Sequence, residues 1–191
     1  MPSGTGSDKW SEALVIRFST FPRTETPTVF VERVVQVFER HSVEIGTVHR
    51  EKGLASNEAL ACLRQDLVDL GFSVESGKRA EDKIKRPVFF GENARPDLQD
   101  EVDAWHPEWK VGLEVEAGRA WMGNAIYRDL IQALVMVEMD HLFLAVPLAY
   151  KYKSSGKQTI SRDYENTVSV AQTLFGHTRV TMPFSLCVIG Y

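Results

Sequence analysis

Five acidic side chains occur within residues 101–118, EVDAWHPEWKVGLEVEAG, a stretch that otherwise has the pattern of two β-strands and a turn. Strands disfavour Asp and Glu, and like charges that face each other across a sheet are destabilising. Three of these residues, Asp103, Glu114 and Glu116, supply the oxygen ligands that hard divalent cations prefer, and no Cys or His has ligand spacing around them. The chemistry indicated is Mg²⁺ binding, for which we expect Mn²⁺ to substitute.

A hairpin closed by the four-residue loop PEWK would bring these acids together. Side chains alternate along a strand, so Glu114 and Glu116 share one face. Pairing residues 101–106 with residues 111–118 across this loop puts Asp103 opposite Glu114, with Cβ atoms about 5 Å apart. This register keeps the apolar partners on one face and the carboxylates on the other, whereas a slip of one residue would mix the two faces.

Three carboxylates on one patch would repel one another and raise at least one pKa unless a cation neutralises them. The simplest alternative is that the acids only solvate the outer face of the hairpin. The flanking segments are strongly apolar, which favours a central hairpin and a metal site. We therefore expect Asp103 and Glu114 to be metal ligands, with the carbonyl oxygen of Val115 as a further ligand.

The elements that would position this hairpin alternate between helices and strands. Residues 56–71 and 121–138 are predicted to be helices, residues 72–76 a short strand, and the apolar run 141–148 a buried strand. With the hairpin, the order is helix, three strands, helix, strand, which predicts an α/β domain with a mixed central β-sheet flanked by helices. The other predicted elements are strands 13–20, 88–90 and 184–191, helices 26–41 and 162–176, and loops 42–55, 91–100 and 151–157.

Length and composition place the chain among ordinary globular proteins. It has 191 residues, 43% of them hydrophobic, and a net charge of −4, which argues against a protein that mainly sheathes DNA or an anionic membrane. Cys62 and Cys187 lie in apolar runs and are predicted to be buried reduced thiols of a cytoplasmic protein. The apolar run 13–18 is too short to span a membrane, and residues 1–9 are predicted to be a disordered tail.

The order of elements, with Asp103 on one strand and Glu114-Val115-Glu116 on the next, resembles the PD-(D/E)XK nuclease superfamily. The motif of that superfamily is an Asp followed, on the next strand, by an acidic residue, any residue and Lys. The resemblance covers about half the chain. It implies that residues 10–191 form one restriction endonuclease-like domain with an αβββαβ core. It also implies a Mg²⁺-dependent endonuclease that hydrolyses the phosphodiester bonds of DNA.

The chain departs from the family motif at Glu116, where most members have Lys, although some restriction endonucleases have an acidic or amide residue there. Two roles stay open for Glu116, because it could accept a proton from the attacking water or help to hold a second metal ion. Asp97 is a second choice for the motif Asp. Pairing Asp97 with Glu114 would force Pro107 into a strand, where it costs a ladder hydrogen bond.

Basic residues are needed to contact the phosphates of DNA. The candidates are Lys78, Arg79, Lys83, Lys85, Arg119 and Arg128. The basic loop 151–157 is a further candidate, with Tyr150 and Tyr152 able to stack on bases. For each basic residue the alternative is a solvated loop or an internal ion pair.

Glu58 is a further candidate for a catalytic carboxylate, because the first core helix of this superfamily often carries an acidic residue aimed at the site. Its alternative role is local: with Ser56 as the predicted N-cap, Glu58 lies in a first helical turn, where negative charge is favoured.

Two rival functions remain at this stage. The same fold could be a non-catalytic DNA- or protein-binding module, or the carboxylates could serve a phosphohydrolase of small phosphoesters. A homodimer would suit cleavage of both DNA strands.

Overall fold

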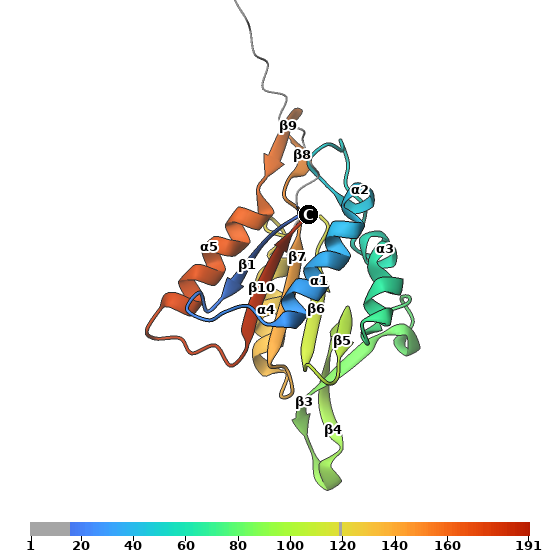
Figure 1. Cartoon of the computed structure of the whole chain (residues 1–191), viewed down its shortest axis with the longest axis vertical. Coiled ribbons are helices and arrows are strands. Elements are labelled where there is room, and N and C mark those ends of the chain that lie inside the picture. The colour runs from blue at the N-terminus through green and yellow to red at the C-terminus, as the bar shows by residue number, and fades with distance from the viewer. Residues whose placement is uncertain (1–15, 119) are drawn as a thin grey trace, which may run out of the picture.

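A six-stranded mixed sheet forms the centre of the part of the chain that the computed structural model describes, residues 16–118 and 120–191 (Figure 1). The strand order is β1-β10-β7-β6-β5-β2. Strands β10, β7 and β6 are parallel, whereas β1, β5 and β2 run antiparallel to the strands that they join. The bounds are Arg17–Phe21 (β1), Ser73–Val74 (β2), Ala104–His106 (β5), Val111–Val115 (β6), His141–Val146 (β7) and Ser185–Gly190 (β10).

Helices cover both faces of this sheet. Helices α1, α2 and α3 pack on one face, and α4 and α5 pack on the other (Figure 1). Their bounds are Val29–Arg40 (α1), Ser42–Ile45 (α2), Ser56–Asp69 (α3), Ala125–Val135 (α4) and Asp163–Gly176 (α5). The predicted class, a mixed α/β fold with a mixed central sheet flanked by helices, is confirmed.

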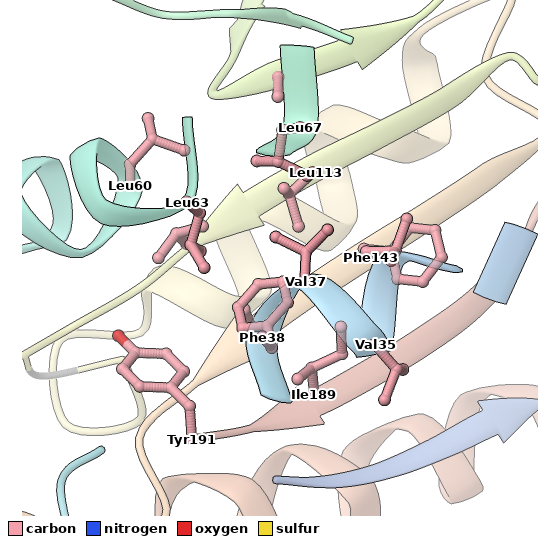
Figure 2. Close-up of a cluster of buried hydrophobic side chains, with 14 of the residues drawn as sticks. Val35, Val37, Phe38, Leu60, Leu63, Leu67, Leu113, Phe143, Ile189 and Tyr191 are labelled. Atoms are coloured by element: carbon pink, nitrogen blue, oxygen red, sulfur yellow. The ribbon is translucent and has the colours of Figure 1, made fainter. Parts of the chain in front are cut away.

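The core under α1 and α3 follows directly from helical periodicity. Leu60, Leu63 and Leu67 recur three and four residues apart on α3, and each is almost fully buried. They face the same cluster as Leu113 of β6 and Phe38 of α1 (Figure 2). Each such side chain contributes about 1.5–3 kcal/mol through burial, and together they fix α3 against the sheet.

The central part of the chain has the predicted succession of elements. Among the elements of the central sheet and its helices, α3 is followed by β2, β5 and β6, then by α4 and β7, and the strands β3 and β4 are inserted between β2 and β5. Strands β2, β5 and β6 pair in an antiparallel array, and β7 returns parallel to β6. The crossover through α4 places that helix on the face of the sheet opposite α3.

A two-stranded ribbon projects beyond the sheet (Figure 1), and from the sequence a strand was expected for residues 88–90 but not the pairing of two strands. It consists of β3 (Ile84–Phe90) and β4 (Pro96–Val102), joined through a short helical turn, Glu92–Ala94. The prediction of a loop over residues 91–100 was therefore wrong for its second half. Val88 and Val102 are buried, at 3% and 2% exposed, whereas Phe89 and Leu98 are 60% and 48% exposed. The ribbon therefore lacks the regular alternation of apolar and polar residues that would have marked it as a strand pair.

Smaller differences concern the ends of elements. The predicted basic loop 151–157 is most of a hairpin formed by β8 (Tyr150–Ser154) and β9 (Lys157–Ser161). The predicted helix 121–138 is shorter at both ends, because turns occupy residues 120–124 and the chain becomes extended at Met136. The predicted loop 42–55 contains the short helix α2. The short 3₁₀ turn Ala80–Asp82 precedes β3.

Two further predictions fall wholly or partly on residues outside the described ranges. The predicted tail, residues 1–9, lies outside them, as does the first part of the predicted strand 13–20; the described part forms β1. Within the described ranges, no helix combines the length and the apolar character needed to cross a membrane.

Candidate functional site

The hairpin that carries the acidic residues has the predicted register. Ala104, Trp105 and His106 of β5 pair with Leu113, Gly112 and Val111 of β6. The loop between them is the tetrapeptide PEWK, in a turn. Two further strands flank the hairpin, β2 beside β5 and β7 beside β6. The hairpin is thus inside the sheet, and its acidic face is not a solvated outer surface.

Asp103 lies at a bend between β4 and β5, one residue beyond the last regular pair. Its Oδ2 accepts a hydrogen bond of 2.8 Å from the backbone N–H of Val115. Burial raises the pKa of Asp103 to about 6, while this hydrogen bond opposes the rise. The hydrogen bond holds the Asp103 carboxylate beside β6, which is the strand that carries Glu114.

Glu114 lies in the middle of the sheet and is 9% exposed. Its neighbours Leu113 and Val115 belong to the apolar cluster under α1 and α3, so the Glu114 side chain is on the opposite face, beneath α4. Burial first, and then the negative charge of Asp103, raises the pKa of Glu114 well above its usual value. Asp103 is therefore near enough for its negative charge to act on Glu114, as the predicted register requires.

A fourth acid, Asp129, comes from α4 and was missed in the sequence. It is 1% exposed, and its Oδ2 is buried without a hydrogen-bond partner in the described part of the chain. Its charge raises the pKa values of Asp103, Glu114 and Glu116, so it faces the same cluster. The signal was available: Asp129 occupies a position in the apolar stripe of α4, between Ile126 and Ala133.

Glu116 and Arg128 complete the inner part of the site. The guanidinium group of Arg128 donates to Glu116 Oε1 at 2.7 Å and to Asp129 Oδ1 at 2.8 Å. Even so, burial and the neighbouring Asp129 charge raise the pKa of Glu116 to about 7. The side chain of Arg128 is 61% exposed, so it connects buried acids with the solvent.

A fifth buried acid, Glu75, follows β2 and was also missed. It is 5% exposed, its N–H donates to the Asp103 carbonyl oxygen at 2.8 Å, and its carboxylate forms an ion pair with Lys83 at 2.7 Å. The hydrogen bond to Glu75 raises the pKa of Lys83. Lys83 was predicted to contact DNA, and in the structure it serves as an internal counter-ion beside the acid cluster.

We name Asp103, Glu114, Glu116, Asp129 and Glu75 the acid cluster. Two cationic groups lie within it, Arg128 and Lys83. If all five acids were ionised, three negative charges would remain without a counter-charge. Such an excess in a buried site is unfavourable unless protons or a cation neutralise it.

The described side chains do not form a finished metal site. Within residues 16–118 and 120–191, no three or more His, Cys, Asp or Glu side chains are already arranged to hold an ion. One oxygen of Asp103 is bonded to the Val115 N–H, and Glu116 and Asp129 are tied to Arg128. The donor chemistry nevertheless fits a hard divalent cation, because the donors are carboxylates and Asp129 Oδ2 is buried without a hydrogen-bond partner among the described residues.

Other predicted acids are not part of the cluster. Glu58 Oε2 accepts a hydrogen bond from the Ala55 N–H at 2.8 Å, which is the local role in the first helical turn. Ala55, not Ser56, is the N-cap; Ser56 Oγ instead accepts from the Ala117 N–H at 3.1 Å. Asp97 is exposed near the far end of the ribbon, where β4 pairs with β3 and not with β6.

The remaining basic candidates lie on the surface or outside the described ranges. Lys78 and Lys85 are exposed, and Arg79 is paired with Glu81 at 3.5 Å. Arg119 lies outside the described residues. Of the predicted phosphate contacts, the structure therefore brings only Arg128 and Lys83 among the described residues to the acid cluster.

Comparison with known proteins identified no family model, curated protein or solved structure that matches this chain. A function can therefore be inferred only from the topology and from the residues of the site.

Proposed function

We propose that this protein is a Mg²⁺-dependent endonuclease that hydrolyses phosphodiester bonds of DNA and is related to the PD-(D/E)XK superfamily. The observation that carries the proposal is the excess of buried carboxylates on the α4 side of the β5–β6 hairpin. The central sheet and its helices supply the helix, three strands, helix and strand that the resemblance implies, as α3, β2, β5, β6, α4 and β7, with β3 and β4 inserted after β2. Buried acids with raised pKa values, clustered on several elements, are a common property of catalytic sites.

Three acids would hold the ion. Asp103 and Glu114 are its expected ligands, with the Val115 carbonyl oxygen, and Asp129 adds the buried oxygen that has no partner among the described residues. A bound Mg²⁺ would offset the negative charge of the cluster, stabilise charge on the scissile phosphate and favour ionisation of an attacking water.

Glu116 suits the role of the general base. A group transfers protons best when its pKa is near the working pH, and the pKa of Glu116 is about 7. Its Oε atoms would accept the proton of the attacking water, in the place where most of the superfamily has Lys. The exposed guanidinium of Arg128 would contact a phosphate oxygen as the substrate enters.

The test is cleavage of supercoiled plasmid DNA with Mg²⁺, with Mn²⁺ or with EDTA. We expect cleavage with either ion, none with EDTA, and at least about 100-fold slower cleavage for Asp103→Asn and Glu114→Gln. Glu108→Gln, an exposed acid in the hairpin loop, is the matched control and should cleave normally. Cleavage that persists in EDTA, or in both site variants, would contradict the proposal.

A non-catalytic DNA- or protein-binding module is the second candidate, and one observation favours it. Arg128 already neutralises part of the cluster through Glu116 and Asp129. That candidate predicts weak or no Mn²⁺ binding in calorimetry and no cleavage of any DNA. Hydrolysis of a chromogenic phosphodiester without cleavage of plasmid DNA would instead indicate a small-molecule phosphohydrolase.

A further inference from the structure

A cleft of about 1030 Å³ opens beside the C-terminal end of β6. The loop before α3 and the first turn of α3 form one side, and β8 forms another. The residues that matter for its chemistry are Lys52, Gly118, Tyr150, Tyr152 and Lys153. None of these residues belongs to the acid cluster.

One wall of the cleft is a fixed pair of tyrosines. Tyr150 and Tyr152 point to the same side of β8, with ring centroids 5.8 Å apart and ring planes inclined by only 13°. Between them, Lys151 donates from Nζ to the carbonyl oxygens of Val48 and Arg50 at 2.7 and 2.8 Å. This double hydrogen bond fastens β8 to the loop before α3, so the stacked rings are held in place.

The tyrosine pair is close to the acid cluster. A Cβ added to Gly118 would lie 3.3 Å from Tyr150 Cε2, so the ring contacts the backbone that follows β6. Gly118 is two residues beyond Glu116, and two trans peptide units span at most about 7.6 Å between Cα atoms. A group stacked on these rings would therefore lie close to the proposed site of hydrolysis.

The charges around the cleft suit a polyanion. Lys52 and Lys153 are exposed and form no ion pair within the described residues. The acid that lines the cleft, Glu58, accepts a hydrogen bond from the Ala55 N–H at the start of α3. Aromatic faces combined with cations along a groove are the means by which proteins hold single strands, because every base has a face that can stack.

We propose that this cleft binds unpaired nucleotides of the substrate, with a base stacked on the Tyr150–Tyr152 pair and phosphates near Lys52 and Lys153. The inference rests on the proposed nuclease function and narrows its substrate class to single-stranded DNA, or duplex DNA with an unpaired segment. Bases inside an intact duplex are stacked on one another and have no free face for the tyrosines.

Binding without metal tests the cleft independently of catalysis. The probe is fluorescein-labelled oligothymidine of about 15 nucleotides, compared with a duplex of the same length by fluorescence anisotropy in EDTA. We expect the single strand to bind at least tenfold more tightly. Tyr152→Leu should weaken that binding about tenfold, whereas Tyr152→Phe, which keeps the ring, should not. Tyr127→Leu, an exposed tyrosine on α4, is the matched control.

Photo-crosslinking locates the bound strand without any variant. An oligothymidine in which bromodeoxyuridine replaces thymidine should crosslink to the peptide that contains Tyr150 and Tyr152. Equal affinity for duplex, unchanged binding by Tyr152→Leu, or crosslinks confined to residues 78–86 would each overturn the inference. If the strand binds in the cleft but Mg²⁺ produces no cleavage, the nuclease function fails while the binding site stands. If duplex DNA is cleaved with no preference for single strands, the nuclease function stands while the binding site fails.

Discussion

The two faces of β6 are almost equally buried but chemically opposite. Toward α1 and α3 the strand presents Val111, Leu113 and Val115, all within an apolar cluster. Toward α4 it presents Gly112 and Glu114. A Cβ at Gly112 would collide with the Met139 side chain, so the segment after α4 covers this face closely.

The two faces of β6 show that burial does not always stabilise the folded protein. On the α1 and α3 side, each buried group adds to the hydrophobic free energy of folding. On the α4 side, burial desolvates carboxylates and raises their pKa values, so the same depth of packing opposes folding at neutral pH. Replacing buried ionic groups with apolar ones often stabilises proteins, which is why an acid cluster in this position indicates a function other than stability.

Truncating the apolar face should have the largest effect on stability. Leu113 is 0% exposed, so Leu113→Ala removes buried methyl groups and leaves a cavity. We expect the free energy of unfolding to fall by about 2–5 kcal/mol, measured by urea denaturation. Leu98→Ala on the exposed ribbon should change it by less than about 0.5 kcal/mol. A loss below about 1 kcal/mol for Leu113→Ala would contradict the assignment of this face as core.

The pH dependence of stability should reveal the acidic face. The pKa values of Asp103 and Glu116 are raised to about 6 and about 7 in the folded protein, so the native state binds protons more tightly than the unfolded chain. Their contribution is fully present below about pH 4 and is lost as the pH rises through 7.

In EDTA, we expect the free energy of unfolding of the wild type to fall by about 2–4 kcal/mol between pH 5 and 8, relative to an Asp103→Asn/Glu116→Gln double variant. Urea denaturation at each pH provides the measurement. A wild type that gains stability over this interval relative to the double variant would show that these acids are not destabilising when ionised.

Removing one buried acid should stabilise the metal-free protein. Gln resembles the protonated form of Glu, and Glu114→Gln therefore avoids the cost of a buried carboxylate whose pKa is raised. At pH 8 in EDTA we expect a gain of about 1–3 kcal/mol, with Glu108→Gln in the exposed loop unchanged. The gain should shrink when Mg²⁺ is added, because the ion would bind the wild type preferentially. A loss of stability in EDTA would mean that Glu114 is compensated in the wild type.

Substitutions of surface charges should have the smallest effect on the free energy of unfolding, and they serve as the reference for the substitutions in β6 and its neighbours. Arg79 and Glu81 form an ion pair with side chains 81% and 75% exposed. Arg79→Ala should change the free energy of unfolding by less than about 0.5 kcal/mol, by thermal or urea denaturation. A change above about 1 kcal/mol would show that the segment before β3 makes contacts that its exposure does not indicate.

The features that the sequence predicted correctly are those that the spacing of apolar residues determines. The register of the β5–β6 hairpin follows from alternation, because one face had to be apolar, and so Asp103, Glu114 and Glu116 could be placed on one side of the sheet. The α3 leucines followed from helical spacing, and the mixed sheet flanked by helices followed from the alternation of helices and strands along the chain.

Other features depend on tertiary contacts that no local pattern encodes. The strands β3 and β4 of the ribbon pair with each other, and contacts such as the hydrogen bond from the Val137 N–H to the Pro87 carbonyl oxygen join them to the segment after α4. Glu75 joins the site only because β2 pairs with β5. Asp129 could have been found, since an acid inside the apolar stripe of α4 is an exception to the pattern of that helix. Lys83 was predicted to contact DNA, with a solvated loop as the alternative, but its side chain is half-buried and forms an ion pair with Glu75.

The Val115 amide proton, which is donated to the Asp103 carboxylate, should be sensitive to the state of that carboxylate. Asp103 is also the single residue that separates β4 of the projecting ribbon from β5. Protonation of the carboxylate, or its recruitment by an ion, would weaken that bond and speed isotope exchange at Val115. Reorientation of the ribbon, for example when a ligand binds to it, would also change the exchange rate of the Val115 amide proton. NMR measurement of this one proton would therefore detect a movement of the ribbon.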